Sequence, residues 1–297
     1  MCLLCDLRST PGAPAAVPAA DDALAPHRWR ARRGFLLAGA AAVAGAALPA
    51  SAQVDVGPPS RLRSLVPAEQ VEGAAVQQYG EMMGKARSQS ALAGPDHPQL
   101  VRLRGIAQRL IPFAPRWNER AAGWKWEVNL IGSKQVNAFC MPGGKIAFYT
   151  GLLEQLKLSD DETAMVMGHE MAHALREHAR EQMAKTAGTG MALQLGSQLF
   201  GLGQAGDYGA RALTQLAQLK FSRDDETEAD LVGLELAARG GFQPQAAVSL
   251  WTKMAQVSKN QGGLSFLSTH PTGPDRIRVL QENVPKVDGL YRAARRG

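Results

Sequence analysis

One stretch decides how this chain folds: it reads SDDETAMVMGHEMAHAL at residues 159–175. Its first four residues, S-x-x-E, form a capping-box pattern, which predicts a helix over residues 160–185. Inside that helix, His169 and His173 stand four residues apart in the pattern H-E-x-x-H. Four residues turn a helix by about 400°, so the two imidazoles lie about 40° apart on one face and can bind the same metal ion.

Glu170 stands between these histidines in the sequence. It lies about 80° round the helix from their midpoint, which is too far for a third ligand but close enough to reach a water at the metal. A carboxylate in that place is typical of the general base of a metallopeptidase. The motif therefore predicts one Zn²⁺ per chain, bound by His169 and His173, with Glu170 as the catalytic base.

A third zinc ligand must come from elsewhere in the chain. His178 follows His173 by five residues. On a continuous helix it lies about 180° from His169, so we expect it to face away from the metal and to be partly exposed.

The acidic stretch SRDDETEADLVG at residues 222–233 offers a better candidate. Glu226, Asp230 and Gly233 are spaced i, i+4 and i+7, on one face of a helix. Glu226 is the expected third ligand, Asp230 can accept the free N–H of a ligating imidazole, and Gly233 allows close approach of the two helices. Glu228 is about 200° from Glu226 and should point elsewhere. The alternative is a solvated acidic first turn.

The rest of the pattern predicts a mostly helical α+β fold with a small sheet beside the active-site helix. Strands are expected at 124–131, 136–141 and 145–150, with the turn Pro-Gly-Gly at 142–144. Further helices are expected from Pro67, from a cap at Asp96 to about residue 111, and over about 210–239, 244–259 and 275–283.

The N-terminal region has the composition of an export signal. Two arginines at 32–33 precede an apolar run at 35–48, and Ala-Ser-Ala follows at 50–52. We predict a signal peptide over 1–52 of the twin-arginine type, a linker over 53–66 and a zinc metallopeptidase domain over 67–297. The general secretory route and an uncleaved anchor are alternatives. The apolar run is shorter than the ~20 residues of a bilayer span, so no membrane span is expected in the mature chain.

Charge and cysteine content exclude other classes of protein. The chain has 33 Lys+Arg against 27 Asp+Glu, with no basic run interleaved with aromatics, so no nucleic-acid partner is expected. Three cysteines exclude a disulfide-stapled scaffold, and Cys140 is expected to be a small buried residue.

Four blocks in order resemble those of peptidase family M48, the gluzincins that include HtpX and the CAAX prenyl protease. They are N-A-F with P-G-G (137–144), H-E-x-x-H (169–173), S-R-x-x-E-x-x-x-D (222–230) and T-H-P with an arginine (269–276). The chain resembles most the exported bacterial BepA and LoiP type, without transmembrane helices or a helical-repeat domain. The resemblance implies a zinc endopeptidase with His169, His173 and Glu226 as ligands, Glu170 as catalyst and Asp230 as the aspartate of the third block.

Two further segments have roles that depend on this resemblance. Asn137, Ala138 and Phe139 belong to a strand that, in such proteins, pairs with an extended substrate, although an ordinary internal strand is the alternative. His270 precedes a proline and should project from a loop. It is expected to stabilise an oxyanion, to bind zinc as a fourth ligand that closes the site, or simply to pack on the fold. The glycine-rich stretch 188–209 is a candidate flap, a flexible connection or a membrane-touching loop.

The expected function is thus a zinc-dependent endopeptidase of the bacterial cell envelope. Its expected location is the periplasm, with or without membrane association, and its expected substrates are unfolded or misassembled polypeptides. Outer-membrane or other envelope proteins are candidate partners. The alternative is a chaperone-like assembly factor with a closed zinc site and little proteolytic activity.

Overall fold

The computed structural model describes residues 54–187, 219–261, 265–270 and 275–296. The expected export signal at 1–52 and the glycine-rich stretch at 188–209 lie outside these residues. None of the helices in the described part of the chain has the length and hydrophobicity needed to span a bilayer.

Three strands form one small sheet: β1 (Glu127–Ile131), β2 (Ala138–Met141) and β3 (Lys145–Tyr149), in the order β1-β3-β2. β2 and β3 pair antiparallel, with Phe139 opposite Ala147, whereas β1 and β3 pair parallel. The predicted turn at 142–144 joins β2 to β3, and its two glycines have positive φ, which glycine adopts without steric cost. β2 is therefore an edge strand of the sheet.

The other described elements are helical, so the chain is mostly helical with a small sheet, as predicted. They are η1 (Arg61–Leu65), α1 (Ala68–Ser88), α2 (Pro98–Leu110), η2 (Ile111–Arg116), η3 (Glu119–Gly123), α3 (Thr150–Leu156), α4 (Asp160–Leu175), α5 (His178–Ala187), α8 (Arg223–Arg239), α9 (Ala246–Gln261), α10 (Ser265–Thr269) and α11 (Arg276–Ala294).

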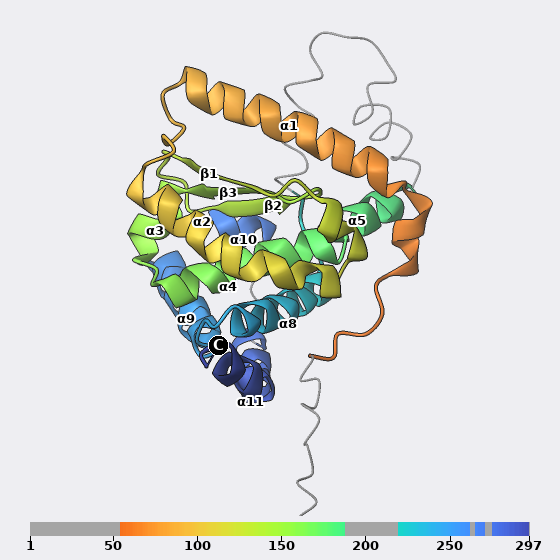
Figure 1. The fold of residues 1–297 in the computed structure, drawn as a ribbon, viewed down its shortest axis with the longest axis vertical. Helices are drawn as coiled ribbons and strands as arrows, with labels where there is room; N and C mark the ends of the chain where they lie inside the picture. Colours follow the sequence, from red (N-terminus) through yellow and green to blue (C-terminus); the bar gives the residue numbers. More distant parts are fainter. Residues whose placement is uncertain (1–53, 188–218, 262–264, 271–274, 297) are drawn as a thin grey trace, which may run out of the picture. The chain divides into compact units, whose positions relative to one another are not determined.

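Helices cover both faces of the sheet (Figure 1). α1 lies along one face and α2 and α4 lie over the other, while α8 packs on the far side of α4. Strand residues alternate between the two sides, as a pleated sheet requires. The α1 side buries Tyr79 against Phe139, Met141 and Ala147, and the α4 side buries Leu130, Ile146 and Phe148 in the larger core.

α4 and α8 lie in backbone contact. Both helices start with a capping box, at Ser159 and Ser222 respectively. Glycines at the crossing allow the contact, because a Cβ on Gly233 would lie 2.6 Å from the backbone nitrogen of His169, and a Cβ on Gly168 would lie 2.8 Å from the carbonyl oxygen of Gly233. Gly233 therefore has the packing role that the sequence predicted.

The helix predicted over 160–185 is broken, and this prediction was wrong. α4 ends at Leu175, Glu177 adopts φ 61°, and α5 starts at His178. No glycine or proline marks this break in the sequence. Ion pairs to Glu177 from Arg63 and Arg180 hold it instead.

Other boundaries also differ from the predicted ones. His97, not Asp96, caps α2, because its ring accepts a hydrogen bond from the backbone of Gln99. α8 starts only after its cap at Ser222, with irregular backbone at 219–222. α11 continues past Pro285 to Ala294, well beyond the predicted end. The short helices α3 and α10 were not predicted.

Candidate metal centre

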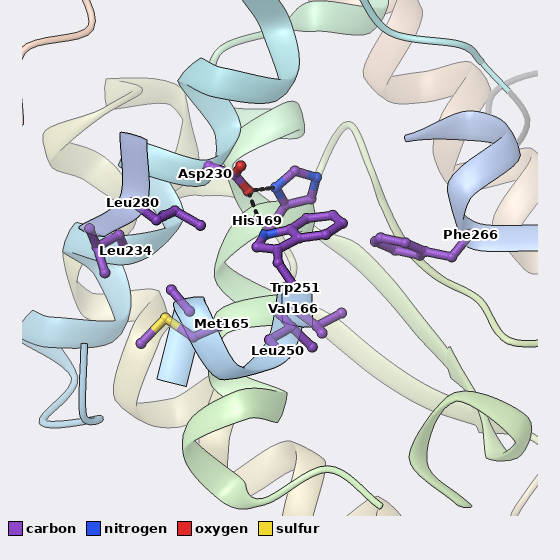
Figure 2. Close-up of a pocket in the computed structure, with 10 residues that line it drawn as sticks. Met165, Val166, His169, Asp230, Leu234, Leu250, Trp251, Phe266 and Leu280 are labelled. Atoms are coloured by element: carbon purple, nitrogen blue, oxygen red, sulfur yellow. Dashed lines mark hydrogen bonds and ion pairs between the residues drawn. The ribbon is translucent and has the colours of Figure 1, made fainter. Parts of the chain in front are cut away.

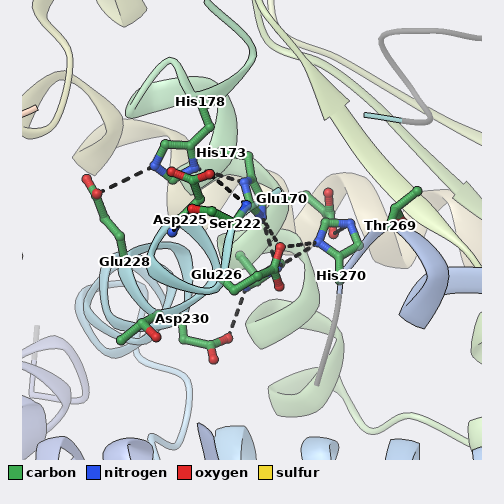
Figure 3. A network of polar contacts seen from close by, with 12 residues as sticks. Glu170, His173, His178, Ser222, Asp225, Glu226, Glu228, Asp230, Thr269 and His270 are labelled. Atoms are coloured by element: carbon green, nitrogen blue, oxygen red, sulfur yellow. Dashed lines mark hydrogen bonds and ion pairs between the residues drawn. The ribbon is translucent and has the colours of Figure 1, made fainter. Parts of the chain in front are cut away.

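Four buried side chains converge beside the α4–α8 crossing (Figure 3). His169 and His173 come from α4, Glu226 from the first turn of α8, and His270 from the residue after α10. Each offers one nitrogen or oxygen atom, and these four atoms lie within 4.8 Å of one another. None of the four residues is more than 4% exposed. In the described part of the chain this is the one group of side chains that could hold a metal ion.

The distances between these atoms fit a bound zinc ion. Nε2 of His169 lies 3.1 Å from Nε2 of His173, and Glu226 places its two oxygens 3.5 Å and 3.4 Å from these nitrogens. Nδ1 of His270 lies 3.3 Å from Nε2 of His169 and 3.0 Å from Oε1 of Glu226. Ligand atoms at 2.0–2.1 Å from a tetrahedral ion lie about 3.3 Å from each other. The donor set and its spacing therefore suit Zn²⁺.

The electrostatics of the site favour the metal-binding forms of His173 and Glu226. Burial lowers the pKa of His173 well below its ordinary value, so its imidazole is neutral. Burial alone would raise the pKa of Glu226, but hydrogen bonds from His173 and His270 outweigh it and keep the carboxylate ionised. A neutral imidazole and an ionised carboxylate are the forms in which these two residues bind zinc.

Asp230 lies behind His169, where the sequence placed it. Its Oδ1 is 3.0 Å from Nδ1 of His169, and it also accepts a hydrogen bond from the indole of Trp251 at 3.2 Å (Figure 2). Burial would raise the pKa of Asp230, but the Arg276 guanidinium outweighs it and lowers the pKa. An ionised Asp230 fixes the proton of His169 on Nδ1 and leaves Nε2 free to bind metal.

Arg276 joins Glu226 and Asp230 of α8, a role that spacing alone did not indicate. Its guanidinium donates to Oε2 of Glu226 and to Oδ2 of Asp230, both at 2.7 Å, and it stacks over the Trp251 ring at 3.5 Å. The signal in the sequence was the arginine in the fourth block of the resemblance. Arg276 therefore holds the expected third ligand in place.

A small pocket behind His169 has a mostly apolar lining. Figure 2 shows the residues that form it: Met165, Val166, Leu234, Leu250, Trp251, Phe266 and Leu280, together with His169 and Asp230. Because this surrounding excludes bulk water, the hydrogen bond between His169 and Asp230 is stronger than it would be at the surface.

Glu170 lies next to the four atoms but is not one of them. Its Oε1 is buried and has no hydrogen-bond partner among the described residues, with Nε2 of His270 at 3.5 Å. Burial raises the pKa of Glu170, which the nearby histidines offset only in part. A buried carboxylate oxygen without a hydrogen bond is costly, and such atoms are typical of sites that act on a water or a substrate.

Comparison with known proteins decides the family. Residues 101–284 match the model of Peptidase family M48. This chain belongs to peptidase family M48. It is 32% identical over 216 residues to the mitochondrial metalloendopeptidase OMA1 of Saccharomyces cerevisiae, covering 69% of this chain and 61% of the yeast protein. The metalloprotease LoiP of Escherichia coli is 26% identical over 190 residues (62% of this chain, 72% of LoiP). The beta-barrel assembly-enhancing protease of E. coli is 31% identical over 159 residues (50% and 32%).

These comparisons support the family but not the narrower bacterial type. Mitochondrial and bacterial members both match, and the yeast OMA1 match is longer than the LoiP match. The chain spans less than two thirds of the length of the yeast OMA1 protein.

β2, the strand expected to pair with substrate, is at one edge of the sheet. Asn137 directly precedes β2, and Ala138 and Phe139 begin it; all three are buried. The amide nitrogen of Phe266 donates to the backbone carbonyl of Val136 at 2.9 Å, so α10 contacts the chain just before the strand. Cys140 on the same strand is buried, which raises the pKa of its thiol well above the ordinary value.

His178 does not lie where the sequence predicted. It is 1% exposed, not partly exposed, and its Nδ1 lies 2.9 Å from Nδ1 of His173. Burial lowers the pKa of His178 to about 4. The break after α4 is the cause, because it interrupts the helix at Glu177 and brings His178 against His173 instead of on the opposite face.

Proposed function

We propose that this chain is a zinc-dependent endopeptidase. His169, His173 and Glu226 would hold one Zn²⁺, Asp230 would orient His169, and Glu170 would be the general base. The observation that carries the proposal is the convergence of four metal-binding atoms beside a buried carboxylate, Glu170, whose Oε1 accepts no hydrogen bond from the described residues. Membership of a peptidase family supports the same chemistry.

Glu170 would move the proton during hydrolysis. When bound, Zn²⁺ polarises the scissile carbonyl and makes water more acidic. Glu170 takes a proton from the attacking water and passes it to the leaving amine, so that one acid–base group serves both halves of the reaction. Burial raises the pKa of Glu170 toward neutral pH, and a general base works best when its pKa is near the working pH.

β2 would bind the substrate as an added strand. An extended peptide that pairs with the Asn137–Phe139 segment would be held by backbone hydrogen bonds, which are shared by all sequences. Such binding gives loose sequence preference and selects for extended, unfolded chains. Support comes from the place of β2 as the last strand of the sheet and from its packing against α4.

The proposed setting is the bacterial cell envelope, with a signal peptide over 1–52, a linker over 53–66 and a catalytic domain over 67–297. The substrates would be unfolded or misassembled envelope proteins, and the place of action would be the periplasm. The name of one relative, beta-barrel assembly-enhancing protease, agrees with outer-membrane partners. The OMA1 relatives carry mitochondrial names, so the shared property is endopeptidase activity and not the compartment.

His270 would be a fourth donor that closes the site in the conformation described. Its Nδ1 lies 3.3 Å from Nε2 of His169 and 3.0 Å from Oε1 of Glu226, as close as the ligand atoms of His169, His173 and Glu226 lie to one another. The same observation favours a second candidate function, a chaperone-like assembly factor in which a closed zinc site leaves no room for water. Stabilisation of an oxyanion is the alternative role for His270.

Metal analysis joined to a cleavage assay tests the proposal. The purified mature protein should contain close to one zinc per chain and should cleave casein internally, as mass spectrometry of the products would show. Chelator treatment should remove both zinc and activity, and added zinc should restore both. Bound zinc without cleavage of casein, even after His270→Ala opens the site, would favour the assembly factor.

A further inference from the structure

The break between α4 and α5 brings a second, non-ligand histidine against the site. Because α4 ends at Leu175 and a new helix starts at His178, His178 is not on the far side of the helix but beside His173. The ring of Phe221 stacks on the other side of the His173 ring, with centroids 4.0 Å apart. His173 is therefore enclosed, and its only nitrogen that points away from the four-atom cluster meets His178.

His178 in turn contacts an acidic residue of α8 (Figure 3). Its Nε2 lies 3.6 Å from Oε2 of Glu228, and the guanidinium of Arg176 forms an ion pair with the same carboxylate. Glu228 is on the side of α8 away from Glu226, as the sequence predicted. A continuous series of contacts thus runs from His173 through His178 to Glu228 and Arg176.

The proton positions along this series follow from the direction in which His173 faces the site. A histidine binds metal through a nitrogen that carries no proton, and for His173 this is Nε2, the atom in the cluster. Its proton is then on Nδ1 and is donated to Nδ1 of His178. His178 must therefore carry its own proton on Nε2, where it faces the Glu228 carboxylate.

We propose that His178 is a positioning residue that fixes the tautomer and the ring orientation of His173, with Glu228 fixing His178. This inference rests on the proposed zinc site. It gives His173 what Asp230 gives His169, a buried acceptor on Nδ1. Arg276 holds Asp230 directly, whereas Arg176 holds Glu228, the carboxylate that faces His178. The two ligands differ in that His169 faces a carboxylate directly, whereas His173 reaches one through a second imidazole.

Residues from the segment before α1 hold the break in place. Arg63 in η1 donates to Glu177 at 2.7 Å, and Arg180 forms an ion pair with the other oxygen of the same carboxylate. Arg176 and Arg180 also donate to backbone carbonyls of the 57–66 segment. The left-handed conformation at Glu177 is costly for a residue with a side chain, so these contacts supply the stabilisation that keeps His178 against His173.

Two substitutions of His178 separate positioning from packing. Asparagine places its oxygen where Nδ1 of histidine lies and can still accept from His173, whereas leucine fills similar space and accepts nothing. Zinc affinity should fall about 10–100-fold in His178→Leu, and His178→Asn should recover most of that loss. His97→Leu removes an exposed histidine outside the cluster and should leave zinc affinity unchanged. Affinity is measured by competition with a chelator, and the melting temperature (Tm) of each metal-free protein is recorded beside it.

Equal zinc affinity in the leucine and asparagine variants would overturn the inference. Ring ¹⁵N spectra of the wild-type, zinc-loaded protein test it without any substitution, so a variant that fails to fold does not decide the matter. They should show the proton of His173 on Nδ1 and that of His178 on Nε2; a proton on Nδ1 of His178 would overturn the inference. Wild-type protein that binds no zinc would contradict the proposed function instead.

Discussion

Replacement of Gly233 by alanine tests whether the close contact of α4 and α8 positions the ligands. The new Cβ would lie 2.6 Å from the His169 nitrogen and 2.8 Å from the Gly168 carbonyl carbon, both backbone atoms that cannot rotate away. Ordinary contact begins near 3.4 Å, so the helices must separate locally by roughly 0.8 Å. Zinc sites tolerate only about 0.2 Å in ligand distance, and α8 carries Glu226.

The expected cost of Gly233→Ala follows from this overlap. Insertion into a packed contact costs ~3 kcal/mol, and the better helix propensity of alanine returns about 1 kcal/mol. The net loss of roughly 2 kcal/mol or more lowers Tm by at least about 4 °C for a domain of this size. Zinc affinity should fall about tenfold or more, as for the loss of a group that orients a ligand.

Gly105→Ala is the matched control, because Gly105 lies inside α2 with nothing within 4 Å of its added Cβ. That variant should gain about 0.5–1 kcal/mol and keep its zinc affinity. The measurements are thermal unfolding by circular dichroism and chelator competition. Wild-type Tm and wild-type zinc affinity in Gly233→Ala would refute the reasoning.

Three further predictions concern single side chains. Glu226→Ala should weaken zinc binding far more than Glu228→Ala in a metal titration, because only Glu226 offers an atom to the cluster; equal losses would contradict this. His270→Ala should keep or raise casein turnover if His270 closes the site, whereas a loss of about 10²–10³-fold would assign it to the oxyanion. Burial raises the pKa of Glu162, but hydrogen bonds, that from Lys253 first, outweigh it and hold the pKa below 4.5. A carboxylate whose pKa is lowered by folding stabilises the fold above its unfolded-state pKa, and that stabilisation is lost as pH falls through the lower folded-state pKa. Glu162→Gln should therefore cost ~1 kcal/mol at pH 7 and less in acid, measured as the Tm difference from wild type; a difference that stays constant with pH would contradict this.

Sequence reasoning worked where a local pattern sets the structure. The capping box at Ser159, the i, i+4 spacing of His169 and His173 and the Pro-Gly-Gly turn each depend on residues close together in the chain. These patterns placed the start of the main helix and the last strand, and the i, i+4 spacing of Glu226 and Asp230 placed both on the face of α8 that meets the histidines.

Sequence reasoning failed where residues far apart in the chain determine the path of the backbone. The break at Glu177 is held by arginines from η1 and α5, so helix periodicity put His178 on the wrong side. The role of Arg276, which holds Glu226 and Asp230, requires α11 to pack against α8, and no spacing rule indicates that contact. The place of His270 beside the cluster likewise depends on how α10 packs, which the sequence left open between three roles.

The most direct test of the central claim compares wild type with Glu170→Gln in one experiment. Both proteins are purified as the mature chain, their zinc content and Tm are measured, and casein cleavage is followed. We expect equal zinc and a similar Tm, because Glu170 is not one of the four ligand atoms. We expect casein cleavage to fall to background in the variant, because an amide cannot take the proton from water. Cleavage within a few-fold of wild type by zinc-loaded Glu170→Gln would contradict the account.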